Sequence, residues 1–198
     1  WILCSLKKRM GIFLLVAIGE ICLSSCGHSG IRHPWFVTWE EEVQLSYGRI
    51  IVVDQKRECD AQVIGACVNR ESWLTVKLPE FNSKPIVWNE KLIPYVLNIH
   101  EGTLYIVGVP PTNFEYRLYE RPKPPYLGYR YDKSGWWRPI PFNEIPTEIY
   151  DTNLLISTPE RSTKRISVNI KNSDEFNGGA KATRGLLRID PNHKSNFN

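Results

Sequence analysis

The sequence has no apolar run long enough for a membrane-spanning helix, and it has no dominant charge. Its longest hydrophobic stretch, residues 11–19, is far shorter than the roughly 20 apolar residues that a helix needs to cross a bilayer. A formal net charge of +4 over 198 residues gives no electrostatic basis for nucleic-acid binding. One Met stands against seven Trp, nine Tyr and 14 Pro. This balance disfavours a helical bundle and favours β structure, because aromatic side chains pack well on pleated sheets.

Catalytic and metal-binding motifs are also absent from the sequence. The histidines are His28, His33, His100 and His193. None has a second ligand at helical spacing, whereas a zinc site needs three or four convergent ligands. Residues 27–30 begin like a nucleophile elbow, but Ile31 stands where that motif has its final glycine. Pro122–Pro125 has the spacing of a polyproline ligand, for which a structural loop is the simpler interpretation. We therefore expect no metal, no cofactor and no enzymatic activity.

The first 25 residues are typical of a secretory signal peptide. A cationic segment at residues 7–9 precedes the apolar stretch, which Glu20 interrupts toward its end. Residues 23–26 then read Leu-Ser-Ser-Cys. The small serines give a signal peptidase access to the peptide bond, and the thiol is the group that carries a lipid. The pattern resembles the lipobox of bacterial lipoproteins and predicts cleavage before Cys26 and lipidation of that residue.

The lipobox resemblance also implies a location. Residue 27 is Gly rather than Asp, which in such lipoproteins implies transport to the outer membrane, facing the periplasm. Residues 26–34 then form the lipid anchor and a polar tether. The alternative is an ordinary secretory signal in which Cys26 is incidental. Removing residues 1–25 takes away three cations and one carboxylate and leaves a charge of +2, so the mature protein is nearly neutral.

The remaining cysteines form an even pair after export. Cys4 and Cys22 leave with the signal peptide and Cys26 takes the lipid, so Cys59 and Cys67 remain. An oxidising periplasm permits a disulfide between them, and a loop this short is worth about 2–3 kcal/mol in the chain-entropy model. Two buried free cysteines are the alternative.

Alternating apolar residues predict a mainly β domain over residues 35–158, built from antiparallel hairpins in a meander. The first hairpin turns at Gly48, which supplies the positive φ that such turns require. Residues 113–121 are expected to form a helical turn or a loop, and residues 144–156 a short helix. Residues 159–198 are expected to be a polar, basic and partly disordered tail, in which residues 186–189 could dock locally. A single strand is expected at residues 73–78. Hairpins are expected between residues 38–45 and 50–53, between 86–88 and the chain from 92 onward, between 95–99 and 104–108, and between 126–132 and 136–140.

Two groups of side chains are candidate sites within this domain. The aromatic residues near the last hairpin form a possible binding surface, with core packing as the alternative; they are Tyr126, Tyr129, Tyr131, Trp136 and Trp137. Three consecutive carboxylates belong to Glu40, Glu41 and Glu42. Alternation on a strand places the Glu41 side chain on the face opposite those of its two neighbours. We expect this cluster to solubilise an edge strand.

The mature chain contains several short motifs, at residues 39–43, 48–53, 124–126, 129–131, 135–136, 140–141 and 188–191. Together they resemble a group of small, uncharacterised lipoproteins of Gram-negative bacteria. The similarity spans most of the mature body and implies its location and extent, and no activity. Such proteins tend to have Asp-Gly at the first hairpin, where this sequence has Tyr47-Gly48.

These observations together predict a lipid-anchored, non-enzymatic binding or accessory module of the cell envelope. Its expected partners are the membrane, through the N-terminal lipid, and an envelope or secreted protein. The alternative is a carbohydrate-binding or cell-wall-modifying protein that uses the Tyr and Trp surface together with Glu40–Glu42. The exposure of Trp136 and Trp137 separates the two, because sugar binding needs an accessible aromatic face.

Overall fold

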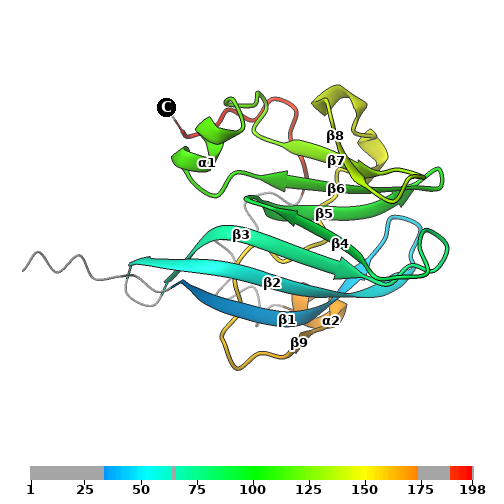
Figure 1. Cartoon of the computed structure of the whole chain (residues 1–198), viewed down its shortest axis with the longest axis horizontal. Helices are drawn as coiled ribbons and strands as arrows, with labels where there is room; N and C mark the ends of the chain where they lie inside the picture. The colour runs from blue at the N-terminus through cyan, green and yellow to red at the C-terminus, as the bar shows by residue number, and fades with distance from the viewer. Residues whose placement is uncertain (1–33, 64–65, 174–187, 198) are drawn as a thin grey trace, which may run out of the picture. The chain divides into compact units, whose positions relative to one another are not determined.

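A computed structural model describes residues 34–63, 66–173 and 188–197, and the fold is given for these ranges. Within them the chain forms two mostly antiparallel β-sheets and two short α-helices (Figure 1). The predicted mainly β class is therefore confirmed. No helix of the described residues is both long enough and apolar enough to cross a membrane.

The first sheet has the strand order β4-β3-β2-β1-β9. Its members are β1 (Trp35–Gln44), β2 (Ile50–Val63), β3 (Ala66–Val76), β4 (Ile86–Glu90) and β9 (Arg165–Ile166). Neighbouring strands from β1 to β4 are antiparallel. The short β9 pairs with β1 in parallel, opposite Glu40 and Glu41. A segment from near the C-terminus therefore lies along the open edge of β1.

The second sheet has the order β5-β6-β7-β8 and is antiparallel throughout. Its strands are β5 (Ile93–His100), β6 (Thr103–Val109), β7 (Leu127–Tyr131) and β8 (Trp137–Ile140). Helix α1 (Asn113–Leu118) connects β6 to β7, and its N-cap is Thr112, whose hydroxyl accepts from the Phe114 N–H. Two 3₁₀ turns, Phe142–Glu144 and Thr147–Ile149, stand where one short helix was predicted.

Three predicted hairpins are present. β1 and β2 turn at Gly48, whose φ is +89°, and the Leu45 N–H donates to the Arg49 carbonyl at 2.8 Å. β5 pairs with β6 and β7 pairs with β8, and β6 is central in its sheet. β8 is an edge strand, in accord with its Pro139, which has no N–H to donate to a further strand.

The predicted hairpin between residues 86–88 and the strand after Leu92 is wrong. β4 pairs with β3 in the first sheet, whereas β5 pairs with β6 in the second, so the chain changes sheets at Lys91 and Leu92. The reason is burial: both strands have an apolar face, and placing them in opposed sheets buries the two faces against one shared core. A hairpin between them would have set these faces side by side.

The main hydrophobic core lies between the two sheets. Trp88 of β4 meets Tyr129 of β7 edge-to-face, with ring centroids 5.8 Å apart. Each fully buried aliphatic side chain contributes roughly 1.5–3 kcal/mol of transfer free energy. The other buried members include Val53, Leu74, Val76, Ile86, Leu97, Leu104 and Ile106.

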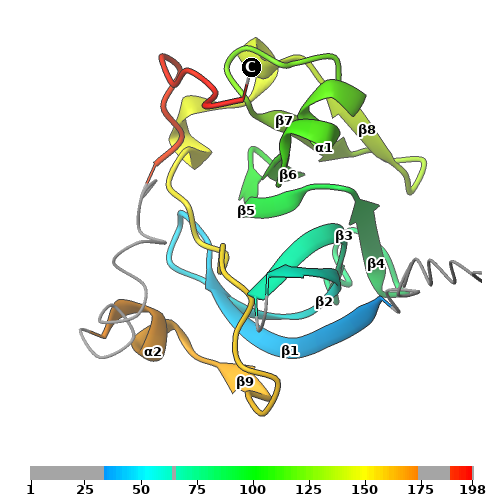
Figure 2. The ribbon, with the colours of Figure 1, turned by 90° about the vertical axis from the view of Figure 1, so that its left-hand side faces the viewer.

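After the second 3₁₀ turn the chain returns to the first sheet. Residues 153–156 cross the inner side of that sheet before β9 and α2 (Val168–Asn172), as Figure 2 shows. Ile166 of β9 and Ile189 are each 1% exposed, and Arg188 forms an isolated bridge with Asp151. Described parts of the predicted tail therefore pack on the β domain, and local docking near residue 189 is observed.

Candidate functional site

The predicted aromatic surface divides into core residues and one exposed ring. Tyr126, Tyr129 and Tyr131 are buried, because β7 directs Tyr129 and Tyr131 into the core between the sheets. For these three tyrosines the structure therefore agrees with the core-packing alternative and not with a binding surface. Trp137 packs on Tyr131 and donates its indole N–H to the Val87 carbonyl at 3.0 Å. Trp136 is 72% exposed.

Trp136 lies at one end of the molecule, here called the loop end, where several chain turns meet. These turns are residues 45–49, 77–85, 100–103 and 132–136, and the hairpin turns of β1–β2, β5–β6 and β7–β8 lie together on the right of Figure 1. A groove of about 850 Å³ opens among them. Its lining includes Tyr47, Glu80, Tyr105, Arg130, Asp132 and Arg138.

The carboxylates of this groove are held by arginines. Glu80 pairs with Arg49, and Asp132 pairs with Arg138. Asp132 Oδ1 also accepts the Trp136 N–H at 3.1 Å, which fixes the turn that projects Trp136. The hydrogen bond from Arg138 holds the pKa of Asp132 well below its usual range, and the bond from Arg49 does the same for the pKa of Glu80. Both groups are therefore ionised acceptors at neutral pH and not proton donors.

Sequence reasoning missed this groove, although part of its signal was present. Asp132, Ser134 and Gly135 have the composition of a tight turn, in which the first side chain accepts from the backbone ahead of it. The Ser134 N–H does donate to Asp132 Oδ1, at 2.9 Å. Tyr47, Glu80 and Tyr105 lie far from this turn in sequence, and no local pattern places them beside it.

A second polar arrangement lies inside the molecule, around Glu41 of β1. The Glu41 side chain has no exposed surface. Its Oε1 accepts from the Leu155 N–H at 2.7 Å and from Lys171 Nζ at 2.9 Å. Its Oε2 accepts from Gln55 Nε2 at 2.7 Å and from Trp39 Nε1 at 3.2 Å. Both oxygens are thus occupied, and Glu41 holds the crossing segment and α2 against β1.

The predicted role of the three glutamates is partly corrected by this arrangement. Glu40 is exposed, and Glu42 pairs with Arg165 at 2.9 Å, so both meet solvent on the outer side of the strand. Glu41 faces inward, as strand alternation predicted, but it does not solubilise an edge. The segment around Leu155 and helix α2 cover that face, and neither neighbour could be inferred from the local sequence.

Asn153 extends the same network to the second sheet. Its side-chain amide accepts the Leu97 N–H at 3.0 Å and donates to the Leu97 carbonyl at 2.7 Å, which satisfies the edge of β5 as a neighbouring strand would. The amide also donates to the Gln44 carbonyl at 3.0 Å, and the Asn153 carbonyl accepts from Lys171 Nζ at 2.7 Å. One residue therefore joins β1, β5 and α2.

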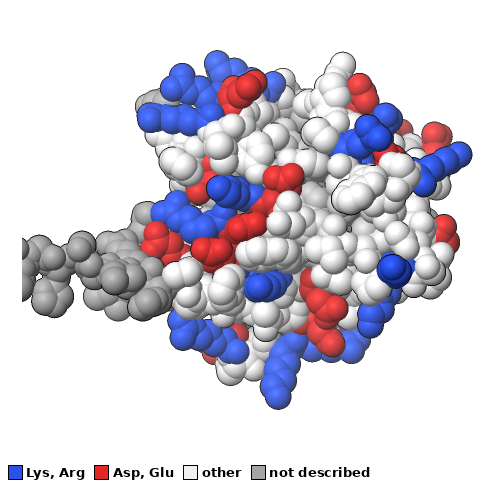
Figure 3. All heavy atoms as spheres, in the orientation of Figure 1, with Lys and Arg blue, Asp and Glu red and all other residues white. Residues whose placement is uncertain are grey.

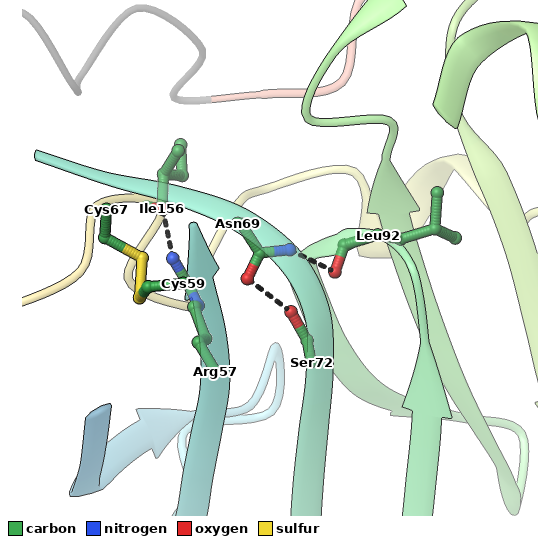
Figure 4. Close-up of a disulfide and its surroundings, with 7 residues drawn as sticks. All are labelled: Arg57, Cys59, Cys67, Asn69, Ser72, Leu92 and Ile156. Atoms are coloured by element: carbon green, nitrogen blue, oxygen red, sulfur yellow. Dashed lines mark hydrogen bonds between the residues drawn. A yellow bond between two sulfur atoms is a disulfide. The ribbon is translucent and has the colours of Figure 1, made fainter. Parts of the chain in front are cut away.

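At the opposite end of β1 and β2 from the loop end, Cys59 and Cys67 form a disulfide with Cα atoms 4.9 Å apart (Figure 4). Trp35 pairs with Cys59 in the sheet register, so β1 begins at this end, here called the disulfide end. The buried side chain of Arg57 lies next to the disulfide. A pocket of about 800 Å³ is lined by residues that include Trp35, Arg57 and Cys67.

Other predicted sites fall elsewhere. Cys26, with the signal peptide, His28 and His33, lies outside the described residues. His100 and His193 lie among the described residues. No group of three side chains that could hold a metal ion occurs among those residues. Pro122–Pro125 forms part of the loop between α1 and β7.

The comparisons with known proteins give no relatives. No protein-family model matches the chain, no curated protein matches it, and no solved structure matches it.

Proposed function

We propose that this protein is a lipid-anchored, non-enzymatic binding module of the bacterial cell envelope. The lipid is carried on Cys26, and the tether of residues 26–34 leads to Trp35 at the disulfide end. Trp35, to which the tether leads, and the groove lie at opposite ends of the β1–β2 hairpin.

The observation that carries this proposal is the exposure of large aromatic rings at the loop end. Tyr47 lines the groove, and Trp136 belongs to the turn that supplies Asp132 to the lining. Trp136 is 72% exposed and Tyr47 is 55% exposed, and the groove wall adds Arg130 and Arg138. Tryptophan, tyrosine and arginine are the residue types that most often dominate protein-binding interfaces. Positive and negative side chains are interspersed on the face of the molecule that Figure 3 shows, which favours a protein partner over nucleic acid.

Site-directed photocrosslinking in the producing bacterium tests this proposal. A photoreactive phenylalanine analogue at position 136 is expected to capture one envelope or secreted protein reproducibly. The matched control is position 114, because Phe114 is 65% exposed on α1, away from the groove. Trp136→Ala is expected to lower recovery of the same partner about tenfold or more, as loss of a central aromatic contact does. Equal capture from positions 114 and 136, or no reproducible partner, contradicts the proposal.

A carbohydrate ligand is the second candidate, and the same exposed ring favours it. Sugars stack on accessible aromatic faces, and the groove places Tyr47 and Tyr105 near the paired carboxylates Glu80 and Asp132. Sedimentation with purified peptidoglycan sacculi distinguishes the two candidates. Sugar binding predicts that the wild type sediments with sacculi and that Trp136→Ala stays in the supernatant. A wild type that stays in the supernatant eliminates this candidate.

The anchor is tested separately, by metabolic labelling with an alkyne fatty-acid analogue. We expect the wild type to take the label, and Cys26→Ala to lose it and move to the soluble fraction. Cys22→Ala is the matched control, because Cys22 lies in the predicted signal peptide and its loss leaves the label in place. Unchanged labelling or unchanged membrane association of Cys26→Ala contradicts lipidation at this residue.

A further inference from the structure

Arg57 of β2 is an enclosed cation. Its side chain is on the inner face of the sheet, and the residue is 1% exposed. Nη1 donates to the Ile156 carbonyl and Nη2 to the Leu155 carbonyl, each at 2.6 Å. The contact with Ile156 is drawn in Figure 4. The guanidinium lies 5.1 Å from the centre of the Trp39 ring.

The charge of Arg57 is not neutralised by a carboxylate in contact with it. Within residues 34–63, 66–173 and 188–197, no Asp or Glu forms an ion pair with this guanidinium, and Nε has no hydrogen-bond partner. Glu41 is the buried carboxylate in the same interior, and its ion pair is with Lys171. Burial lowers the pKa of Arg57 to about 10, so the group stays charged at neutral pH. Glu41 attracts this charge through space without an ion-pair contact. A buried charge without a carboxylate in contact with it is costly, which favours a bound anion.

A pocket of about 800 Å³ has Arg57 in its wall, which is within the roughly 300–1,000 Å³ range of small-molecule sites. Apolar groups supply most of the lining surface. Its polar side chains include the buried amide of Asn69 and, among the exposed residues, the carboxylate of Glu160. Arg161 stacks over the Trp35 ring at 4.0 Å and is exposed, so it stands at the rim. The apolar lining comprises Trp35, Val68, Ile93, Pro111, Ile156 and Pro159.

We propose that this pocket binds a small monocarboxylate with an apolar chain, of the fatty-acid class. The carboxylate pairs with the Arg57 guanidinium in the pocket wall, and the chain lies along the apolar lining. A guanidinium has five N–H donors, of which the two backbone carbonyls use two, so donors remain for a carboxylate. One buried cation matches a monoanion better than a phosphate dianion, because a second negative charge would be buried without a partner. The site is separate from the groove at the loop end.

Calorimetry with sodium decanoate and with decanol tests the proposal on the purified protein. Decanoate is expected to bind at least about tenfold more tightly than decanol, because only the carboxylate forms a charge-assisted hydrogen bond with Arg57. In ¹H–¹⁵N spectra, the Arg57 Nε–H resonance is expected to shift downfield with decanoate and to stay in place with decanol. Equal affinity for the two probes, or no shift of this resonance, overturns the proposal.

Substitutions test which side chain of the pocket binds the carboxylate of decanoate. Arg57→Lys keeps the charge but loses the planar donor set, and we expect it to weaken decanoate binding about tenfold or more. Trp136→Ala at the loop end is the control and is expected to bind within about twofold of the wild type, because it lies outside this pocket. Arg161→Gln tests whether the carboxylate sits at the rim instead. If Arg57→Lys fails to fold, the resonance shift in the wild type decides. Loss of binding in Arg161→Gln with Arg57→Lys unchanged overturns the assignment.

Discussion

At the loop end, charged side chains pair with one another while they remain in contact with water, whereas at the disulfide end Arg57 is enclosed. The Arg49 and Glu80 side chains are 42% and 41% exposed, but Arg57 is 1% exposed and is held by two backbone carbonyls. Solvent screens exposed ion pairs, so they contribute little to stability and are free to exchange partners. An enclosed cation has no such freedom, and it constrains both the fold and any ligand that reaches it.

The interior between these ends shows the same contrast for a carboxylate. Glu41 has no exposed surface and accepts from four donors, while Glu40, its neighbour in sequence, is half exposed and lies 3.6 Å from Arg165. The two residues share a strand and a chemical type, and they differ in what covers them. Burial, not residue type, therefore decides which charges this fold depends on, and substitutions can test that conclusion.

The largest effect is expected for Glu41→Ala. The substitution removes the carboxylate partner of Lys171, whose side chain is only 15% exposed, and leaves the Leu155 N–H without an acceptor. Breaking a buried ion pair in this way costs about 3–5 kcal/mol in the free energy of unfolding. Urea denaturation followed by tryptophan fluorescence measures the loss. Glu40→Ala is the matched control and is expected to cost less than about 1 kcal/mol. Equal losses in the two variants contradict the distinction drawn from burial.

A smaller effect is expected from removing the disulfide at the enclosed end. Because Cys59 and Cys67 are only eight residues apart, the double variant Cys59→Ala/Cys67→Ala is expected to lose about 2–3 kcal/mol of unfolding free energy. Urea denaturation of the oxidised wild type, the reduced wild type and the double variant gives the comparison. The reduced wild type and the double variant should unfold near the same urea midpoint, below that of the oxidised wild type. Coincident midpoints for all three forms show that the bond adds nothing.

Local pattern was enough to predict three hairpins, but not the β2–β3 hairpin or the packing between the sheets. Gly48 marked the first turn, whereas the predicted second strand ended at residue 53 and β2 continues to Val63, with Val53, Gln55 and Arg57 on its inner face. Strand alternation could have indicated that Arg57 is buried. The sheet change after β4 was not predictable in this way, because it depends on the other sheet supplying the opposite wall of the core.

The candidate site was predictable only in part, for a related reason. Trp136 was identified from sequence, and it is exposed; Tyr126, Tyr129 and Tyr131 were identified with it, and they are buried. A tyrosine on a strand has the same local signature in either position. The contacts that decide between them join segments far apart in sequence, as when the Asp190 N–H donates to the Tyr126 hydroxyl at 3.3 Å.

The smallest effect is expected for Glu80→Gln at the loop end. This exposed pair with Arg49 is worth less than about 1 kcal/mol at neutral pH and low salt. The hydrogen bond from Arg49 lowers the pKa of Glu80 in the folded state, so its contribution is present above the ordinary carboxyl pKa and is lost as the pH falls through the lowered value. Urea denaturation of wild type and variant at pH 7, at pH 2, and at pH 7 with 1 M salt measures these differences. The difference in unfolding free energy between wild type and variant should vanish at pH 2. It should shrink in 1 M salt, where the screening length is about 3 Å. A loss of unfolding free energy as large as that of Glu41→Ala, or a loss that salt leaves unchanged, means that the loop-end charges are enclosed as well. The two ends of the molecule then no longer differ in this respect.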